Sequence, residues 1–354
     1  MSVAAGWLAT AWDQNAGAYV ASPIAATLER VAQRWLIELF GLPHTTVAGF
    51  VTGATMANLS ALAAARHDVL ARAGWDVDEQ GLAGAPELTV IAGDEVHPSV
   101  VKGLGLLGLG RSRVRSVPVD GQGRMRADAL PQISGPTIVI AQAGNVNSGA
   151  FDPIAEIIAQ AHEAGAWVHV DGAFGLWAAA APERAHLVRG IGAADSWATD
   201  AHKWLNVPYD SGLTFVRDPR PLRAAMGVTA AYLPDSMLRE PASTPELSRR
   251  ARGVEVWAVM RTLGRAGIAV LVERSCRHAE RFAAGLRAAG HEIVNDVVLN
   301  QGARDVRRLC HDTARRGRRP GGRDMLVRRH RVAGTHRHAY QRFGLGDDRG
   351  RCGS

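Results

Sequence analysis

Lysine is almost absent from this sequence. Lys102 and Lys203 are its only lysines, and arginine supplies the rest of the 41 basic residues. Arginine stays protonated and cannot form an imine, whereas a lysine amine can do so after it loses its proton. Where arginine carries nearly all the positive charge, a retained lysine indicates a chemical role. An ordinary surface lysine is the alternative.

Cysteine and long apolar runs are also scarce. The 3 cysteines, Cys276, Cys310 and Cys352, form neither a metal-binding spacing nor a disulfide framework, so a reducing cytoplasm is expected. No run of 18 apolar residues is present, which argues against a membrane span. The first residues do not show a basic segment followed by an apolar one, so no signal peptide is expected.

Acidic residues are rare in one part of the chain only. Residues 302–354 contain 15 arginines and 5 aspartates but no lysine or glutamate, so the net charge of +7 leaves −3 for the preceding 301 residues. Residues 1–301 therefore have the charge of an ordinary, mildly acidic globular protein, and the net positive charge of the chain comes from residues 302–354. A 47% hydrophobic composition is enough for a large core, in one large domain with a smaller part or in two domains.

Apolar periodicity predicts alternating helices and strands. Ser22 and Pro23 cap a predicted helix that ends at Gly41, and a second, alanine-rich helix runs from Ala54 to about Arg72. Strands are predicted at residues 88–92, 113–118, 137–142, 166–171 and 210–216. A helix at 153–165 joins two of these strands, which makes a βαβ unit and implies a parallel sheet.

Several residues lie where such sheets bind ligands. Ala54 and Thr55 begin a helix after Gly53, and a helix N-terminus favours a phosphate, although most such starts are simple turns. His97 and Asp171 each follow a predicted strand, at the end where open α/β sheets bind ligands. The structural alternatives are an exposed or capping histidine and an aspartate that caps a helix or pairs with a cation. Together with Lys203, these residues favour a pyridoxal phosphate site with the lysine bound as a Schiff base.

The ordered motifs resemble one enzyme family. They are Thr-Gly-Ala-Thr-Met-Ala-Asn-Leu, His97, Gly149-Ala-Phe-Asp152, His169-Val-Asp171-Gly-Ala and Ala194-Asp-Ser followed by His202-Lys203-Trp. This order resembles the group II pyridoxal-phosphate-dependent amino acid decarboxylases, which act on aromatic amino acids, glutamate or cysteine sulfinate. The resemblance covers about residues 10–301. It implies an α/β fold of the fold type I pyridoxal-phosphate-dependent transferase kind, with a mainly parallel seven-stranded sheet flanked by helices.

The resemblance also implies roles for individual residues. Catalysis would fall to Lys203 as the Schiff-base amine, to His97 stacked on the pyridine ring, and to Tyr232 as the proton donor to the substrate. The cofactor would be held by the following residues: Ala54, Thr55 and His202 at the phosphate, Asp171 at the ring nitrogen, Ala173 on the other ring face, and Asn147 at the phenolic oxygen. Arg252 lies in the basic segment after the loop that contains Tyr232.

The implied activity is decarboxylation of an L-amino acid to an amine and CO₂ by a cytoplasmic homodimer. Alternatives are an aminotransferase or another lyase of the same fold, or an inactive truncated remnant. Tyr232 and the His202-Lys203 pair favour decarboxylation. Two features depart from the family. The run Gly144–Asp152 lacks the Thr-Thr pair that usually precedes Gly-Ala-Phe-Asp, so the contact to the phenolic oxygen stays open, with Asn147 as the choice; and Asp200 stands where asparagine is common. A negative charge beside a phosphate is unfavourable unless Thr199 or backbone donors offset it.

The expected organisation has five parts. They are an N-terminal helical segment (1–48), a large cofactor-binding α/β domain (49–225), a mobile catalytic loop (226–248), helices and the start of a small domain (249–301), and an arginine-rich tail (302–354). The amino-terminal region that precedes residue 1 in the family, and helps to form the dimer, is expected to be mostly absent.

The tail departs abruptly from the family after Gln301. It reads as a disordered basic tail, as a nucleic-acid-binding arm, or as the product of a single-nucleotide frameshift. Read one base out of phase with permitted codons, Gly302–Asp312 and Asp324–Gly353 resemble the family's carboxy-terminal domain. We therefore expect a frameshift, a small domain that is missing or scrambled, and no nucleic-acid partner.

Overall fold

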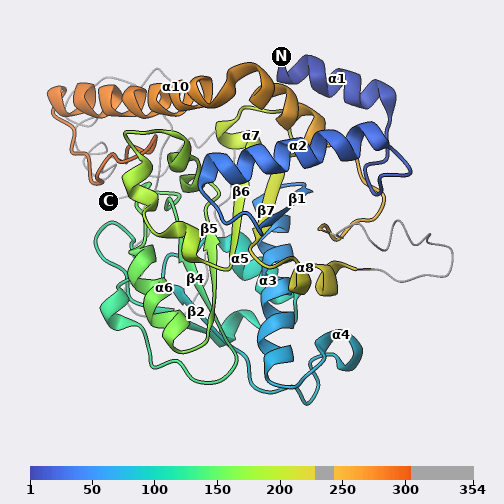
Figure 1. Ribbon diagram of the computed structural model, residues 1–354. Helices are drawn as coiled ribbons and strands as arrows, with labels where there is room; N and C mark the ends of the chain where they lie inside the picture. Colours follow the sequence, from blue (N-terminus) through green and yellow to red (C-terminus); the bar gives the residue numbers. More distant parts are fainter. Residues whose placement is uncertain (228–242, 304–354) are drawn as a thin grey trace, which may run out of the picture.

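Seven strands form one sheet in the order β1-β7-β6-β5-β4-β2-β3, in a computed structural model that describes residues 1–227 and 243–303. The strands from β3 to β6 pair in parallel, whereas β7 is antiparallel to both β6 and β1. This arrangement confirms the predicted mainly parallel seven-stranded sheet (Figure 1). The strands are β1 (Val47–Val51), β2 (Thr89–Gly93), β3 (Val114–Val117), β4 (Thr137–Gln142), β5 (Trp167–Asp171), β6 (Ser196–Asp200) and β7 (Gly212–Val216).

Helices connect and cover the strands. The α-helices are α1 (Ser2–Trp12), α2 (Pro23–Phe40), α3 (Ala54–Arg72), α4 (Val77–Gln80), α5 (Pro98–Leu106), α6 (Ile154–Glu163), α7 (Ala201–Trp204), α8 (Pro219–Met226) and α10 (Gly253–Ala288). Short 3₁₀ helices are η1 (Arg111–Arg113), η2 (Ala127–Ala129), η3 (Gly175–Ala180), η4 (Ala185–Val188) and η5 (Ile191–Ala193). None of these helices combines the length and the apolar character needed to cross a membrane.

The ends of helix α2 show how local sequence sets an element. The Ser22 hydroxyl accepts a hydrogen bond from the Ala25 amide, and Pro23 occupies the first turn. Gly41 ends the helix with a left-handed φ of 64°, a conformation that glycine adopts without steric cost. The predicted helix is therefore confirmed at both ends.

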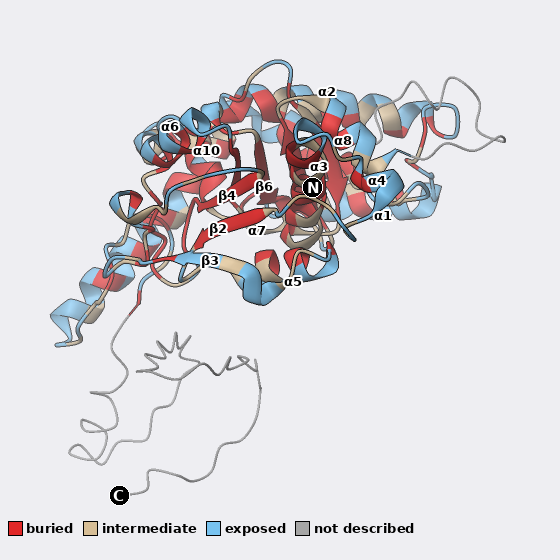
Figure 2. Ribbon diagram, turned by 90° about the horizontal axis from the view of Figure 1, so that it is seen from below, coloured by how far each residue is buried: buried red, intermediate tan, exposed pale blue. Residues whose placement is uncertain are grey.

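Alternate residues of the strands face two different helical layers. One set packs with α3, α5 and α8, and the other packs with α2, α6 and the 3₁₀ helices. Val139 and Val168 belong to the second face, whereas Ile138 and Trp167 belong to the first. A sheet covered on both faces buries nearly all of its side chains, as the strands of Figure 2 show.

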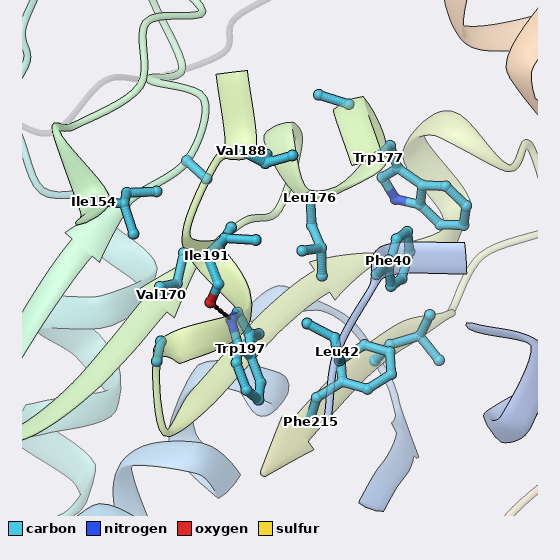
Figure 3. Packing of buried hydrophobic residues seen from close by; sticks show 14 of the residues in the cluster. Phe40, Leu42, Ile154, Val170, Leu176, Trp177, Val188, Ile191, Trp197 and Phe215 are labelled. Carbon is cyan, nitrogen blue, oxygen red and sulfur yellow. Dashed lines mark hydrogen bonds between the residues drawn. The ribbon is translucent and has the colours of Figure 1, made fainter. Parts of the chain in front are cut away.

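Aromatic residues anchor the second face (Figure 3). Trp177 and Phe215 are fully buried, and Phe40 lies edge-on to both rings, at centroid distances of 5.0 Å and 5.8 Å. Trp197 is also buried, and its indole Nε1–H donates to the Ile191 carbonyl at 2.9 Å. This core fixes the strands whose carboxyl ends carry the candidate site.

Two strands were not predicted, and one has an unexpected direction. β1 and β6 lie in stretches that the sequence presented as a glycine-containing turn and a lysine motif, and β7 runs against its neighbours. Tyr232, most of the expected catalytic loop and the tail beyond Ala303 lie outside the described residues.

Candidate active site

A cavity of about 310 Å³ lies at the carboxyl ends of β4, β5 and β6, where they meet the first residues of α3 and α5. This is the edge at which open α/β sheets bind ligands. Most of the predicted site residues line it together, namely Ala54, Thr55, His97, Asp171, Ala173, His202 and Lys203. Asn147 is not among the lining residues, and Arg252 pairs with Asp210 instead, through two hydrogen bonds of 2.9 Å and 3.1 Å.

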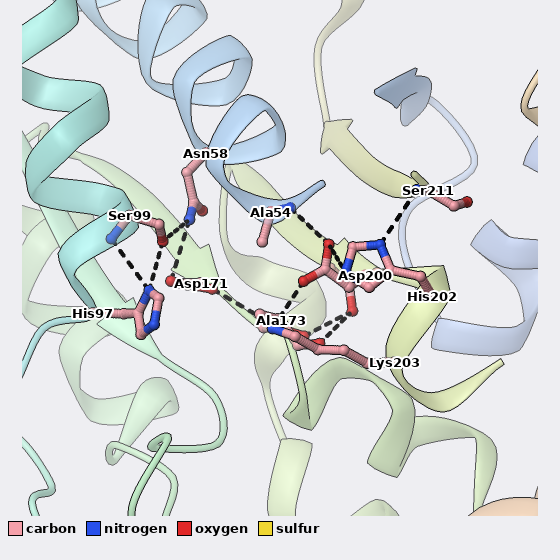
Figure 4. A network of polar contacts seen from close by, with 12 residues as sticks. Ala54, Asn58, His97, Ser99, Asp171, Ala173, Asp200, His202, Lys203 and Ser211 are labelled. Carbon is pink, nitrogen blue, oxygen red and sulfur yellow. Dashed lines mark hydrogen bonds and ion pairs between the residues drawn. The ribbon is translucent and has the colours of Figure 1, made fainter. Parts of the chain in front are cut away.

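Asp200 closes one end of the cavity. Its buried carboxylate accepts a hydrogen bond from the Ala54 amide at 2.6 Å, at the N-terminus of α3 (Figure 4). The positive end of a helix stabilises a negative charge, so the helix offsets this carboxylate. A backbone donor was one of the two expected offsets; the Thr199 hydroxyl instead donates to the Gly172 carbonyl at 2.8 Å.

Lys203 reaches the same carboxylate from helix α7. Its Nζ lies 2.8 Å from Asp200 Oδ2, and 4.2 Å from the centroid of the Phe174 ring. An ammonium over an aromatic face gains a cation–π attraction in addition to the ion pair. The side chain keeps 27% of its surface exposed, toward a cavity that it lines, so the amine is accessible to a ligand.

Asp171 lies across the cavity wall at the end of β5. It is buried, and its two carboxylate oxygens accept hydrogen bonds from the Asn58 side-chain amide and the Ala173 backbone amide, each at 3.2 Å. Burial raises the pKa of this carboxyl, while His97, these donors and Lys203 counteract the rise. A buried carboxylate that opens on a cavity is suited to hold a cationic group of a ligand.

His97 combines the structural and the functional interpretation. Its Nδ1 accepts from the Ser99 amide at 3.2 Å and lies 2.7 Å from the Ser99 hydroxyl, so the ring caps helix α5. Burial lowers the pKa of His97, which keeps the imidazole neutral near pH 7. The ring therefore presents a flat, uncharged surface to the cavity that it lines.

His202 is held by its neighbours on the other side. The Ser211 amide donates to His202 Nδ1 at 3.3 Å, and the Tyr209 ring stacks on the imidazole at a centroid distance of 4.2 Å. His202 Nε2 lies 3.6 Å from Asp200 Oδ1, near the N-terminus of α3. The ring is thus fixed beside the candidate anion-binding site.

Sequence reasoning missed four contributors. Asn58, Ser99 and Phe174 contact the predicted residues, and Gln142 lines the cavity from the end of β4, just before the loop that contains Asn147. Asn58 is a buried amide in an otherwise alanine-rich helix, one turn after Ala54. The amide of Asn58 among the alanines of this helix was the available signal, because a buried polar side chain needs a partner.

The donor set fits pyridoxal phosphate. The site offers an accessible amine at Lys203, a buried carboxylate at Asp171 and a helix N-terminus beside His202, and its volume is in the range of small-molecule pockets. One condition applies, because Asp200 already uses the Ala54 amide that a phosphate would need.

The backbone before α3 lies close to the start of β7. A Cβ added at Gly212 would lie 2.4 Å from the Gly53 Cα, so this close approach requires glycine at position 212.

Comparison with known proteins gives one family. The conserved domain of pyridoxal-dependent decarboxylases matches residues 1–301. The aromatic-L-amino-acid decarboxylase of Bacillus atrophaeus is 30% identical over 314 residues, which cover 84% of this chain and 63% of that protein. Tryptophan decarboxylase 1 of Oryza sativa subsp. japonica is 31% identical over 291 residues, 74% of this chain and 56% of that protein.

Solved structures of similar proteins share the fold. Mouse CSAD in its apo form matches with a TM-score of 0.77 at 25% identity, over 84% of this chain and 64% of that one. Oryza sativa TDC with pyridoxal phosphate and tryptamine matches with a TM-score of 0.76 at 28% identity, over 83% and 64%. The chain thus spans less than two thirds of the length of these relatives.

Proposed function

Because this chain belongs to the family of pyridoxal-dependent decarboxylases, we propose that it binds pyridoxal phosphate and removes the α-carboxylate of an L-amino acid as CO₂. The observation that carries the proposal is the joint placement of Lys203 and Asp171 on one cavity. An amine and a buried carboxylate on the same cavity are the two groups that this cofactor needs most. When bound, the cofactor supplies an electron sink for the charge left by the departing carboxylate.

Four features of the cavity would hold the cofactor. Lys203 would supply the amine for its aldehyde group, and Asp171 would pair with its ring nitrogen. His97 and Ala173 would lie against its ring. The start of helix α3, with Ala54, Thr55 and His202, would hold its phosphate. A buried carboxylate keeps a neighbouring ring nitrogen protonated, because the ion pair favours the charged forms of both groups.

Proton transfer at the amine has a partner in place. Lysine is a nucleophile only after its ammonium loses a proton. Asp200 Oδ2, at 2.8 Å from Lys203 Nζ, is within direct hydrogen-bond reach to accept that proton.

Tyr232, which we expect to protonate the product carbon, lies outside the described residues and stays a prediction. Gln142 is better placed than Asn147 to meet the phenolic oxygen of the cofactor, because Gln142 lines the cavity.

An aromatic L-amino acid is the first substrate to test, because the relatives are named as aromatic amino acid, tryptophan and tyrosine decarboxylases. We also propose a homodimer. Large apolar side chains are exposed over the first 24 residues, along α1, the loop after it and the start of α2, and a second copy of this chain would cover them. They are Met1, Val3, Trp7, Leu8, Trp12, Tyr19, Val20 and Ile24.

A cytoplasmic location is supported by the buried, unpaired Cys276, the one cysteine in the described residues.

Exchange of the two lysines tests the proposal. The purified chain, incubated with pyridoxal phosphate, should acquire visible absorbance, and borohydride reduction should attach the cofactor covalently to Lys203, as peptide mass spectrometry would show. Lys203→Ala should lose both signals. Lys102→Ala is the matched control, because Lys102 is exposed on α5 and should leave both unchanged.

Product analysis separates the activities that share this fold. CO₂ release from a panel of L-amino acids supports decarboxylation, whereas formation of a keto acid would indicate an aminotransferase. A folded chain that takes up no cofactor would favour the inactive remnant. Substrate-dependent CO₂ release that persists in Lys203→Ala would contradict the proposed mechanism.

A further inference from the structure

Behind Asp171 a row of buried polar side chains crosses from the sheet to helix α3. Trp167 Nε1 lies 2.9 Å from Ser196 Oγ, which lies 2.9 Å from His169 Nδ1. His169 Nε2 lies 2.9 Å from Asn58 Oδ1, and Asn58 Nδ2 lies 3.2 Å from Asp171 Oδ2. Three of these side chains, those of Asn58, His169 and Ser196, are completely buried.

The strand geometry explains why this row exists. Trp167, His169 and Asp171 are alternate residues of β5, so they face the same side of the sheet, toward α3. Asn58 comes one turn after the start of α3 and lies opposite them. Polar groups in such a place are costly to bury unless each has a partner, and here each has one.

The direction of the hydrogen bonds in the row follows from the Asp171 carboxylate and from the neutral ring of His169. An indole N–H can only donate, and an ionised carboxylate can only accept. The Asn58 amide hydrogens therefore face Asp171, and Asn58 Oδ1 accepts from His169 Nε2–H. The neutral His169 ring then has Nδ1 as an acceptor, so the Ser196 hydroxyl donates to Nδ1 and accepts from the Trp167 indole. The row thus presents a donor to the carboxylate.

We propose that Asn58 and His169 are positioning residues, which hold the Asp171 carboxylate in place at the cavity through this hydrogen-bond row of fixed direction. The role of Asp171 in binding a cofactor rests on the function proposed above. Asn58 is also linked to His97 on another wall of the cavity. Its Nδ2 lies 3.4 Å from the hydroxyl of Ser99, which is the hydrogen-bond partner of His97. One amide therefore couples the carboxylate to the histidine.

The neutral state of His169 is essential to this arrangement. Burial lowers the pKa of His169 to about 3, so the ring stays neutral throughout the ordinary pH range. Its one ring hydrogen lies on Nε2, which faces the acceptor Asn58 Oδ1, and this leaves Nδ1 as the acceptor. A protonated ring would carry a hydrogen on Nδ1 and would turn the Ser196 hydroxyl away. The row is therefore a fixed support rather than a proton path.

The experiment compares three substitutions with a matched control. Asn58→Leu removes the donor to Asp171 at similar volume. His169→Phe removes the support of Asn58, whereas His169→Gln can keep an N–H near the position of Nε2. Ser60→Ala is the control, because Ser60 is also completely buried on α3 but donates to the Met56 carbonyl, away from the cavity.

Two measurements read the effect, one with cofactor and one without. The dissociation constant of pyridoxal phosphate should rise about tenfold or more in Asn58→Leu and His169→Phe, with a shifted visible spectrum, because a hydrogen bond to a charged group is lost or loosened. His169→Gln should lie close to the wild type, and Ser60→Ala should match it. In the cofactor-free chain, Asn58→Leu should raise the unfolding equilibrium constant, and the rise should be about tenfold larger when Asp171 is present than in an Asp171→Leu background.

Each outcome decides the matter. Equal effects of Asn58→Leu in the two Asp171 backgrounds would overturn the proposal, as would wild-type cofactor affinity and spectrum in His169→Phe. If Asn58→Leu does not fold, the difference between His169→Phe and His169→Gln decides. A wild-type chain that takes up no cofactor contradicts the proposed function instead, and the stability comparison still tests the positioning role.

Discussion

At the scale of single residues, Asp200 places a carboxylate where the proposed cofactor would bring its phosphate. The Ala54 amide at the start of α3 donates to Asp200 Oδ1 at 2.6 Å, and Lys203 pairs with Oδ2. Two anions that compete for one helix N-terminus repel each other. Binding of the phosphate therefore requires that Asp200 gives up the Ala54 amide or shares it.

Asp200→Asn should strengthen cofactor binding. The amide retains an oxygen that can accept from Ala54 but has no negative charge. We expect the dissociation constant of pyridoxal phosphate to fall about tenfold or more, because two unit charges about 4 Å apart interact by about 1 kcal/mol in water and by more inside a protein. Fluorescence titration of the cofactor-free chain measures it. Asp195→Asn serves as control, because Asp195 contacts His162 and the Val168 amide, away from the cavity. A weaker or unchanged affinity in Asp200→Asn would show that the carboxylate does not compete.

Asp152 gives a prediction for the pH dependence of stability. Its buried carboxyl accepts from the Met125 and Gln142 amides at 2.7 Å and 2.6 Å, and burial raises its pKa to about 6. The folded protein keeps this proton at a pH where the unfolded chain has lost it. The contribution of Asp152 to stability is therefore largest below about pH 4 and decreases as the pH rises to about 6.

Comparison with Asp152→Asn isolates that contribution. The difference in unfolding free energy, wild type minus variant, should fall by roughly 3 kcal/mol between pH 4 and pH 7, because one pKa unit corresponds to about 1.4 kcal/mol. Urea denaturation at a series of pH values measures the difference. A difference that does not depend on pH would refute the raised pKa.

Sequence reasoning found the residues with distinctive chemistry and missed their supports. His97, Asp171 and Lys203 follow strands or stand in motifs, so their positions were readable. Asn58 contacts Asp171 from helix α3, and His169 contacts Asn58 from the strand that carries Asp171. These contacts depend on which helix covers this face of the sheet. The sequence does not state that tertiary relation.

At the scale of elements, the parallel strands and their connecting helices were predictable, but β1, β6 and the direction of β7 were not. β1 is interrupted by Gly49, and β6 reads Ser-Trp-Ala-Thr-Asp, so neither shows an unbroken run of apolar, β-branched residues. β7 follows β6 after only the short helix α7 and a turn, and such a short connection returns the chain antiparallel. Direction was thus encoded in loop length rather than in strand composition.

Gly212 links two of these elements and can be tested against a second glycine. An added Cβ at Gly212, at the start of β7, would collide with the Gly53 backbone before α3, so Gly212→Ala should destabilise the fold by at least about 1–3 kcal/mol. Gly285→Ala on α10 meets nothing within 4 Å, and it should stabilise the helix by about 0.5–1 kcal/mol. Thermal unfolding of both variants measures the contrast. An equally stable Gly212→Ala chain would mean that the two segments can separate.

At the scale of the whole molecule, the family match ends at Gln301, the residue after which the sequence resemblance was expected to stop. A frameshift at that point remains our prediction, and sequencing the gene across the Gln301 codon tests it. We expect one base lost or gained relative to related genes. An intact reading frame whose shifted readings resemble no decarboxylase would rule it out.

The exposed apolar face of the first two helices gives a prediction for assembly. Trp7 and Trp12 are 73% and 52% exposed on α1. Trp7→Ser with Trp12→Ser should shift the chain from dimer to monomer in light scattering after size-exclusion chromatography. The paired control is Phe282→Ser, since Phe282 is 74% exposed near the C-terminal end of α10. A wild-type chain that is already monomeric would contradict the proposed dimer.

The pairing of β1 with β7 also constrains the order of folding during translation. Val47 pairs with Val216 and Val51 with Gly212, so the first strand waits for a partner synthesised about 160 residues later. At the usual speed of a ribosome this wait lasts roughly 10 to 30 s. Throughout it, the nascent chain carries an apolar strand with no hydrogen-bonding neighbour in the sheet. A chaperone that shields the stretch around Phe50 during translation would therefore raise the yield of folded protein more than one added after release.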